Sequence, residues 1–394
     1  MRGSTAGLEP DTMKGESATH YAFLSFLDSV FSAAVVTPAV VAFWRSVWEL
    51  MGLYVYPNNS LYSAITSTII GVLGHLMFAL SQHAFEYFHP DKNRMVYYLV
   101  SRVYTVCFAF VCVNGWRGPW SLLDIYTQPN LTSVVVPTAL GVVALASIRA
   151  LRNVSAPPCA IVTDYVKGYF EVVTMFRVPM VQRTSLYILD CLFSVLIVGT
   201  LVVFVWRGAW VLIDIYLFPE MADWSAWASL VLGYMSVAVA FLMQPAMRWL
   251  CDRINGAARL FAADVFLLFS LFGTLNVWRG IWNLLNIYFL PDNLELSCWI
   301  THWVSLILLI LLGCSNSLLV RGVYIDAEEP AGKCVVFPCY YLRLIFQQAR
   351  EKKNGSSSTV QLESMSKRKQ EIDAKYADGN DVKQISINME SNHI

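Results

Sequence analysis

Long uncharged, apolar stretches recur along the chain and alternate with shorter polar ones. Residues 50–85, 125–148, 224–247 and 296–320 contain no Asp, Glu, Lys or Arg. Because a helix needs about 20 mostly apolar residues to cross a bilayer, this pattern predicts an all-α integral membrane protein. The eight transmembrane helices that we expect cover residues 21–43, 61–83, 97–115, 131–149, 185–205, 224–246, 260–277 and 297–319.

Four copies of one aromatic motif lie between these apolar stretches. The fullest form is Trp-Arg-Gly-x-Trp, followed by a Tyr nine positions and a Pro twelve positions after the Arg. The first and third intervals between successive motif Arg are equal and the second is longer; such an internal period indicates a repeated structural unit. We therefore predict four two-helix units, each with one motif in an outer loop and its Trp residues at the membrane interface. The motif residues are Trp44, Arg45, Trp48, Trp116, Arg117, Gly118, Trp120, Asp124, Tyr126, Trp206, Arg207, Gly208, Trp210, Asp214, Tyr216, Trp278, Arg279, Gly280, Trp282 and Tyr288.

Four charged residues inside the predicted spans repeat at a longer interval, the one that separates the first motif from the third. Asp28 and Asp190 lie equally far before their motif Arg, and Arg102 and Asp264 lie equally far before theirs. Together with the alternating spacing of the motifs, this offset predicts two pseudo-repeats of four helices each. An even number of spans in each half gives both halves the same direction, so the repeats are parallel. We interpret the four charges as structural groups at the cytoplasmic edge, with Arg102 paired to an Asp of another helix; a role in a solute path is the alternative.

Composition supports a membrane protein, and the placement of the charged residues predicts its orientation in the membrane. Hydrophobic residues make up 56% of the chain and charged residues 14%, which is typical of a membrane protein rather than a soluble one. The loops at 84–96, 147–184 and 247–260 carry ten Lys and Arg, which places them and both termini in the cytoplasm by the positive-inside rule. The expected division is a cytoplasmic N-tail over 1–19, a first half with its cytoplasmic linker over 20–183, a second half over 184–320, and a cytoplasmic, largely disordered C-tail over 321–394.

The motif Arg needs a partner at membrane depth, and the sequence offers two arrangements. Asp124 and Asp214 each follow a motif Arg by two helical turns, so a local contact requires a bend at the motif Gly. Otherwise the Arg of one unit pairs with the Asp of a neighbouring unit, in a strong and directional ion pair.

The first and last copies depart from this pattern. Gly52 and Asn286 occupy the Asp position, Arg45 has Glu49 one helical turn on, and Arg279 has no local carboxylate. Four Arg against two matched Asp would suit an outward-facing site for an anionic ligand. The simpler interpretation is a set of interfacial clamps that fix each helical hairpin.

The remaining motifs concern modification and binding. Sequons at Asn58 and Asn130 fall on the predicted outer side and predict glycosylation. Cys334 and Cys339 follow the last span and are candidates for palmitoylation, but ordinary reduced thiols are the simpler interpretation. The first part of the C-tail has apolar and basic residues typical of an amphipathic segment on the inner leaflet. From Gly355 onward its polar composition favours disorder and the recruitment of cytoplasmic partners.

No sequence motif of a nucleotide, hydrolase, redox or metal site is present. We therefore expect no enzyme activity, no catalytic residue, no metal, no cofactor and no nucleic-acid partner.

The motif extended to Trp-Arg-Gly-x-Trp-x-Leu-x-Asp-Ile-Tyr-x-x-Pro, repeated across eight predicted spans, resembles the Fuseless family of animal multipass membrane proteins. The resemblance covers roughly residues 20–320 and is strongest in the second and third copies. It implies a neuronal plasma-membrane protein of presynaptic terminals that supports neurotransmitter release. The implied partners are the lipid bilayer and other membrane proteins, voltage-gated calcium channels among them.

Two functional hypotheses follow. In the first, the protein organises or localises other membrane proteins through its outer motifs and its cytoplasmic tail. In the second, it is a transporter or channel for a small, possibly anionic solute, with a path between the two halves. Parallel repeats are compatible with the second hypothesis, whereas fourfold repetition of one motif favours a structural role.

Overall fold

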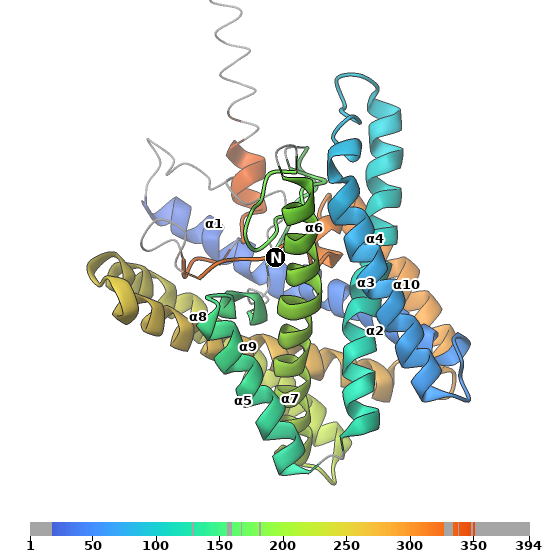
Figure 1. The fold of residues 1–394 in the computed structure, drawn as a ribbon. Coiled ribbons are helices and arrows are strands. Elements are labelled where there is room, and N and C mark those ends of the chain that lie inside the picture. The colour runs from blue at the N-terminus through green and yellow to red at the C-terminus, as the bar shows by residue number, and fades with distance from the viewer. Residues whose placement is uncertain are drawn as a thin grey trace, which may run out of the picture.

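The computed structural model describes residues 18–127, 130–155, 160–166, 168–180, 183–326, 334–337, 339–347 and 350. These residues form helices joined by irregular segments (Figure 1). Seven of the helices are long and apolar enough to cross a membrane. The helix at the predicted fourth span, α5, is apolar but has 17 residues, or about 26 Å of length. The chain is thus an all-α membrane protein, as the sequence predicts.

The helices divide into two sets, according to whether they carry the motif. We call the four that carry it the inner helices and the other four the outer helices. The outer helices are α3 (Ser60–Phe85), α5 (Leu131–Ser147), α8 (Ala222–Arg253) and α10 (Leu294–Leu311). The inner helices are α1–η1–α2 (Ala18–Phe31, Ser32–Val36 and Thr37–Tyr54), α4 (Arg94–Tyr126), α6–η3–α7 (Thr184–Leu192, Phe193–Gly199 and Thr200–Tyr216) and α9 (Gly256–Tyr288).

Local sequence determines where several of these helices begin. Asn59, Asn93, Asn130 and Asn293 each precede the first helical residue of α3, α4, α5 and α10. The side-chain oxygen of each Asn accepts a hydrogen bond from the backbone N–H three positions later, which satisfies one of the free donors of the first turn.

The inner helices end at equivalent places. Each ends at the motif Tyr, and in three of them the residue before the motif Pro has a positive φ. These residues are Tyr56, Phe218 and Leu290, with φ of 51°, 51° and 53°. Because a bulky side chain disfavours the left-handed region, its repeated use shows that the same chain reversal is built into these three copies.

The motif lies inside the inner helices, so the prediction of outer motif loops is wrong. The helices continue without interruption to Tyr54, Tyr126, Tyr216 and Tyr288 instead of stopping before the motif. The motif Gly residues lie inside continuous helices. The prediction failed because it ended these spans just before the motif and treated the Trp and Arg as interfacial, whereas the Arg is bonded within the bundle.

The packed helix pairs also differ from the predicted units. α3 packs along α4, α5 along α7 and α8 along α9, so each outer helix pairs with the inner helix that follows it in the chain (Figure 1). The last outer helix, α10, has no inner helix after it and packs along α2. The final helix therefore closes a ring onto the first inner helix.

Two segments after outer helices fold against the bundle and exchange contacts. The first consists of residues 148–155, 160–166 and 168–178, which follow α5 and contain the turn η2 (Leu151–Val154). The second consists of residues 312–326, which follow α10 and contain η4 (Ser315–Leu318). Asp164 of the first segment accepts hydrogen bonds from the N–H groups of Ser315 and Asn316, at 3.1 and 2.8 Å. Asp326 of the second accepts from those of Leu151 and Arg152, at 2.8 and 2.7 Å. We call this reciprocal arrangement the linker interlock.

The C-terminal segment after the interlock is part of the packed structure over residues 334–337 and 339–347. Phe337 stacks on Phe266 of α9 with a centroid distance of 5.5 Å, and Arg343 pairs with Asp28 of α1. This segment therefore packs against the bundle, while Ile345 and Phe346 stay exposed, and its contact with the inner leaflet stays a prediction. Cys334 and Cys339 are only 3% and 1% exposed, which corrects the palmitoylation prediction, because acylation needs an accessible thiol. The predicted disordered tail from Gly355 lies outside the described residues.

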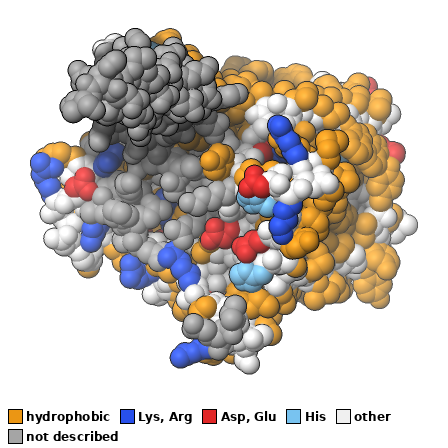
Figure 2. Space-filling model, turned by 90° about the horizontal axis from the view of Figure 1, so that it is seen from above, with side chains coloured by type: hydrophobic (Ala, Val, Ile, Leu, Met, Phe, Trp, Pro, Cys, Tyr) orange, Lys and Arg blue, Asp and Glu red, His pale blue; other side chains and the backbone are white. Residues whose placement is uncertain are grey.

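Charged side chains collect at one end of the molecule. Figure 2 views the end that carries the linker segments, where Lys, Arg, Asp and Glu side chains gather, while hydrophobic side chains cover the flank. An apolar flank with a charged end is what a helical membrane protein requires.

Candidate functional site

The eight motif Trp residues form two closed rings on the axis between the inner helices. In the first tryptophan ring, neighbouring indoles meet edge to face, with centroid distances of 5.3 to 5.8 Å. In the second, the distances are 5.6 to 6.0 Å. Edge-to-face pairs are favourable beyond the area they bury. The first ring is Trp44, Trp116, Trp206 and Trp278, and the second is Trp48, Trp120, Trp210 and Trp282.

This location corrects the prediction of an interfacial aromatic belt. The Trp residues face one another inside the bundle, and two of them are bonded to the linker segments. Trp44 donates its indole N–H to the carbonyl of Leu318 at 3.0 Å, and Trp206 donates to that of Val154 at 2.7 Å. The two rings thus connect the axis to the interlocked segments.

A cavity of about 190 Å³ lies within the rings. Its lining consists of the eight motif Trp side chains with Glu49 and Val320. Glu49 lies within electrostatic range of Arg45, Arg117 and the Trp282 indole. The cavity is therefore aromatic, with one carboxylate among its lining side chains.

The four motif Arg residues form an arginine ring, which we define as Arg45, Arg117, Arg207 and Arg279. All four are buried. Each motif Arg lies beside a residue of the preceding inner helix, two helical turns after the motif Arg of that helix. The fourth inner helix precedes the first in this sense, so the ring is closed. The pairs are Arg207 Nε with Asp124 at 2.9 Å, Arg279 Nε with Asp214 at 2.7 Å, Arg45 Nε with Asn286 at 2.6 Å, and Arg117 beside Gly52.

Pairing between neighbouring units is therefore confirmed, and the local pairing through a bent Gly is not found. Arg45 bonds Asn286 of α9 rather than Glu49 of its own helix. Arg279, which has no local carboxylate, receives Asp214 from α7. Because the guanidinium groups are buried, the outward-facing cationic site is also not found.

The outer helices supply further partners for the arginine ring that the sequence analysis missed. Arg117 donates to the hydroxyls of Ser63 and Ser67, at 3.0 and 2.8 Å. Arg279 donates to Ser225 and Ser229, at 2.7 and 2.5 Å. In both pairs the Ser residues are one helical turn apart, and the two pairs are separated by the same offset as the two halves, so the signal is present in the sequence.

The motif Gly allows a close approach between an inner helix and its outer partner. A Cβ on Gly118 would lie 2.6 Å from the backbone N of Thr68, and one on Gly280 would lie 2.7 Å from that of Leu230. Gly208 faces the side chain of Thr138. Because backbone atoms cannot move aside for a larger side chain, Gly118 and Gly280 determine how closely their helix pairs pack.

Asp28 and Asp190, both buried, hold segments that follow outer helices. Asp28 accepts from the N–H of Leu342 at 2.6 Å and from Arg343 Nε at 2.7 Å. Asp190 accepts from the N–H of Phe176 at 2.9 Å and the hydroxyl of Thr174 at 2.7 Å. Their structural role agrees with the interpretation from sequence.

Arg102 and Asp264 differ from each other. Arg102 forms an ion pair with Asp164 and donates to Ser315 at 2.8 Å, so its partner comes from a linker segment rather than from another helix. Asp264 lies within electrostatic range of Asp326, and its Oδ1 has no hydrogen-bond partner among the described residues.

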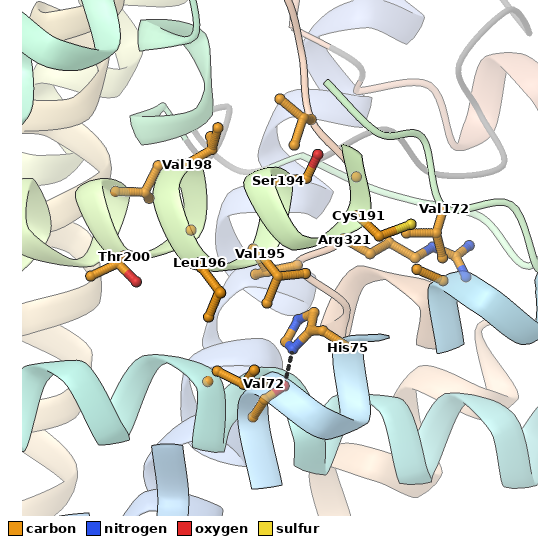
Figure 3. A pocket seen from close by; sticks show the side chains of 18 of the residues that line it. Val72, His75, Val172, Cys191, Ser194, Val195, Leu196, Val198, Thr200 and Arg321 are labelled. Atoms are coloured by element: carbon orange, nitrogen blue, oxygen red, sulfur yellow. Dashed lines mark hydrogen bonds between the residues drawn. The ribbon is translucent and has the colours of Figure 1, made fainter. Parts of the chain in front are cut away.

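A second cavity, of about 170 Å³, lies between α3, α4, the α6–η3–α7 helix and the linker segments. Figure 3 shows His75 of α3 directed toward Val195 and Leu196 of η3, with its Nδ1 2.8 Å from the carbonyl of Gly71. Arg321, buried at the same cavity, donates to Tyr104 at 3.1 Å and to Asn316 at 3.4 Å. The cavity therefore has polar groups at one side and an apolar wall at the other.

The two sequons stay predictions. Asn58 is exposed between α2 and α3, and Asn130 is exposed at the start of α5, where its side-chain oxygen caps the helix. Among the residues that the structure describes, no group of three or more His, Cys, Asp or Glu side chains is placed to hold a metal ion.

Comparison with protein families gives one match. A family model described as Fuseless matches residues 23–319. This range includes the four inner and the four outer helices, except for the first residues of α1. Comparison with curated proteins and with solved structures gave no match.

Proposed function

Since this chain belongs to the Fuseless family, we propose that it organises or localises other membrane proteins in the plasma membrane of presynaptic terminals. The proposed partners are voltage-gated calcium channels, and the proposed outcome is support of neurotransmitter release. The family membership and the apolar helices support a membrane protein. The finer role rests on the arrangement of the motif.

This proposal rests on the observation that all four motif copies make their contacts inside the protein. The arginine ring is buried and bonded between neighbouring helices, and the tryptophan rings occupy the axis. Groups used this way give a rigid frame, because the motif Arg residues form hydrogen bonds across three of the four boundaries between inner helices and to three of the four outer helices. A rigid frame with an apolar exterior suits a protein that positions others in a bilayer.

The outer helices offer surfaces for such partners. On α8, Trp224, Trp227, Val231 and Met235 are exposed and recur at helical spacing along one side. Exposed apolar side chains of this kind contact lipid or the helices of another membrane protein. We propose that the linker-bearing end and both termini are cytoplasmic and that the tail from Gly355 binds cytoplasmic partners.

The alternative, a transporter or channel for a small solute, is favoured by the two cavities. Val320 lines both of them, one within the tryptophan rings and one beside His75. A path between the halves would pass this residue.

One substitution separates the two hypotheses. Val320→Phe adds bulk where both cavities meet, whereas Leu242→Phe makes a comparable addition on the exposed side of α8, where Leu242 is 80% exposed. Neurons that lack the protein would be supplied with wild type or either variant, and calcium-channel density at release sites would be measured by immunofluorescence. For an organiser, Val320→Phe restores the density as wild type does, once surface labelling shows equal amounts of protein.

The same variants would be reconstituted in liposomes for flux of organic anions. Wild-type flux that Val320→Phe removes and Leu242→Phe keeps, together with failed rescue by Val320→Phe, would overturn the organiser in favour of a transporter.

A further inference from the structure

The cavity within the tryptophan rings has a lining that the organiser hypothesis does not use. Its walls are the eight motif indoles, and its volume of about 190 Å³ exceeds the roughly 150 Å³ of a protein cavity that holds benzene. Neighbouring indole centroids are 5.3 to 6.0 Å apart around the two rings. A small group on the axis is therefore within about 6 Å of several aromatic rings, the range over which an aromatic face attracts a cation.

Glu49 is the one charged side chain among the described residues that line this cavity. Arg45 and Arg117 lie within electrostatic range of Glu49, but they bond to outer helices. Arg45 donates to Ser297 of α10 at 3.2 Å, and Arg117 donates to Ser63 of α3 at 3.0 Å. Both guanidinium groups are thus directed away from the axis, whereas the carboxylate lines it.

Two further carboxylates lie at the end of the cavity where the inner helices end. Asp124 and Asp214 follow Trp120 and Trp210 of the second tryptophan ring by one helical turn, on the same face of their helices. Their side chains are 50% and 44% exposed, whereas those of their Arg partners are 3% and 4% exposed. The two carboxylates are also within electrostatic range of each other. This end of the cavity is therefore acidic.

The backbone gives this end the same sign of charge. The four inner helices all end at the motif Tyr. Their Trp residues form closed rings at two successive levels, so the four helices run in the same direction along the axis. The C-terminal end of a helix carries a partial charge of roughly −0.5. Four such ends around one axis favour the entry of a cation over that of an anion.

We propose that the cavity within the tryptophan rings binds the quaternary ammonium group of a small organic cation, which enters from the end where the inner helices end. The indoles surround the methyl groups, and Glu49 supplies the opposite charge. A quaternary ammonium group has no N–H to satisfy, so an aromatic wall suits it, whereas a metal cation such as Ca²⁺ needs several oxygen ligands. The site does not depend on the role proposed above, because binding requires neither a partner protein nor transport.

The test titrates the full-length protein in a non-ionic detergent with choline chloride, at an ionic strength held constant with sodium chloride. Tryptophan fluorescence reports binding, because eight of the 13 Trp residues line the cavity. The wild type should give a saturable change. The uncharged isostere 3,3-dimethylbutan-1-ol, in which carbon replaces the nitrogen of choline, should bind at least about tenfold more weakly, because it fills the same space without the charge.

Two pairs of variants make the test specific. Glu49→Gln keeps the shape of the side chain and removes its charge, so the affinity for choline should fall about tenfold while the affinity for the isostere stays the same. Its control is Glu220→Gln, at an exposed Glu between α7 and α8, which should bind choline as the wild type does. Trp210→Leu should weaken choline binding, whereas Trp224→Leu on the exposed side of α8 should not.

Three results would overturn the proposal. Equal affinities of the wild type for choline and for the isostere would show an apolar cavity without cation recognition. The absence of a saturable response to choline would exclude the site, and an unchanged affinity in Glu49→Gln would place the binding elsewhere. If Trp210→Leu elutes as an aggregate in gel filtration, the comparison of Glu49→Gln with Glu220→Gln decides alone.

Discussion

Arg102 in α4 and Asp264 in α9 occupy equivalent places in the two halves, and each lies beside an Asp of a linker segment. Arg102 forms an ion pair with Asp164, whereas Asp264 lies near the like-charged Asp326. The backbone arrangement around the two linker Asp residues is nevertheless the same, since each accepts hydrogen bonds from two consecutive N–H groups at the start of the other segment's turn.

The difference shows which of these groups the fold depends on. The linker Asp and its backbone bonds are kept in both halves, while the helix residue beside it changes from a cation to an anion. Around Asp326, Arg149 and Arg152 of the first segment supply positive charge instead. The interlock therefore depends on the two linker Asp residues more than on the helix charges.

The largest effect is expected for Asp164→Ala. This change removes the acceptor of the Ser315 and Asn316 N–H groups and also leaves Arg102 without its ion-pair partner. Breaking a fully buried pair typically costs about 3 to 5 kcal/mol, and because Arg102 is partly exposed the loss should lie at the lower end of that range. The free energy of unfolding would be measured by denaturant titration in detergent, with Asp164→Asn as the control that keeps an acceptor oxygen. A loss no larger than that of the equivalent Asp326 change would show that the ion pair contributes nothing.

A smaller loss is expected for Asp326→Ala. The N–H groups of Leu151 and Arg152 lose their acceptor, but no helix cation loses a partner, and the repulsion with Asp264 is removed. Unsatisfied buried donors cost about 1 to 3 kcal/mol. The same titration checks the value, and the double change with Asp164→Ala shows whether the two halves of the interlock are coupled.

The smallest effect is a gain. Asp264→Arg would give the second half the charge arrangement of the first and should stabilise the protein by about 0.5 to 1 kcal/mol, since the site is partly exposed. Burial raises the pKa of Asp326, so Asp326 becomes protonated sooner than a free carboxyl as the pH falls. The gain should therefore be present above that pKa and disappear below it. Asp264→Asn is the control, because relief of repulsion alone would give it the same gain.

Much of the frame could be predicted from the sequence. The apolar stretches give the helices, and the Arg spacing gives the fourfold motif. The pairing of Arg207 with Asp124 was one of two arrangements that a separation of two helical turns permitted. What decides between them is the continuity of the helix through Gly118, which the sequence leaves open because Gly is compatible with both a bend and a close approach.

Other features could not be derived in this way. A charge in an apolar stretch normally ends a span, so the helical continuation past Arg45 depends on partners that are remote in the chain, such as Asn286 and Ser297. The position of the Trp residues on the axis depends on the assembled ring. The linker interlock did have a signal, because Asp164 and Asp326 are separated by the same offset as the two halves, but both lie outside the apolar stretches in which the repeated charges were sought.

The packing of α10 against α2 has a consequence for biosynthesis. Membrane helices leave the ribosome in chain order, so the face of α2 that contacts α10 lacks its partner until the last helix has been inserted. Arg45 likewise receives Asn286 only with α9 and Ser297 only with α10. A premature stop codon before α10 would therefore damage both ends of the chain at once, leaving the earliest helix as a target for the quality-control machinery of the endoplasmic reticulum.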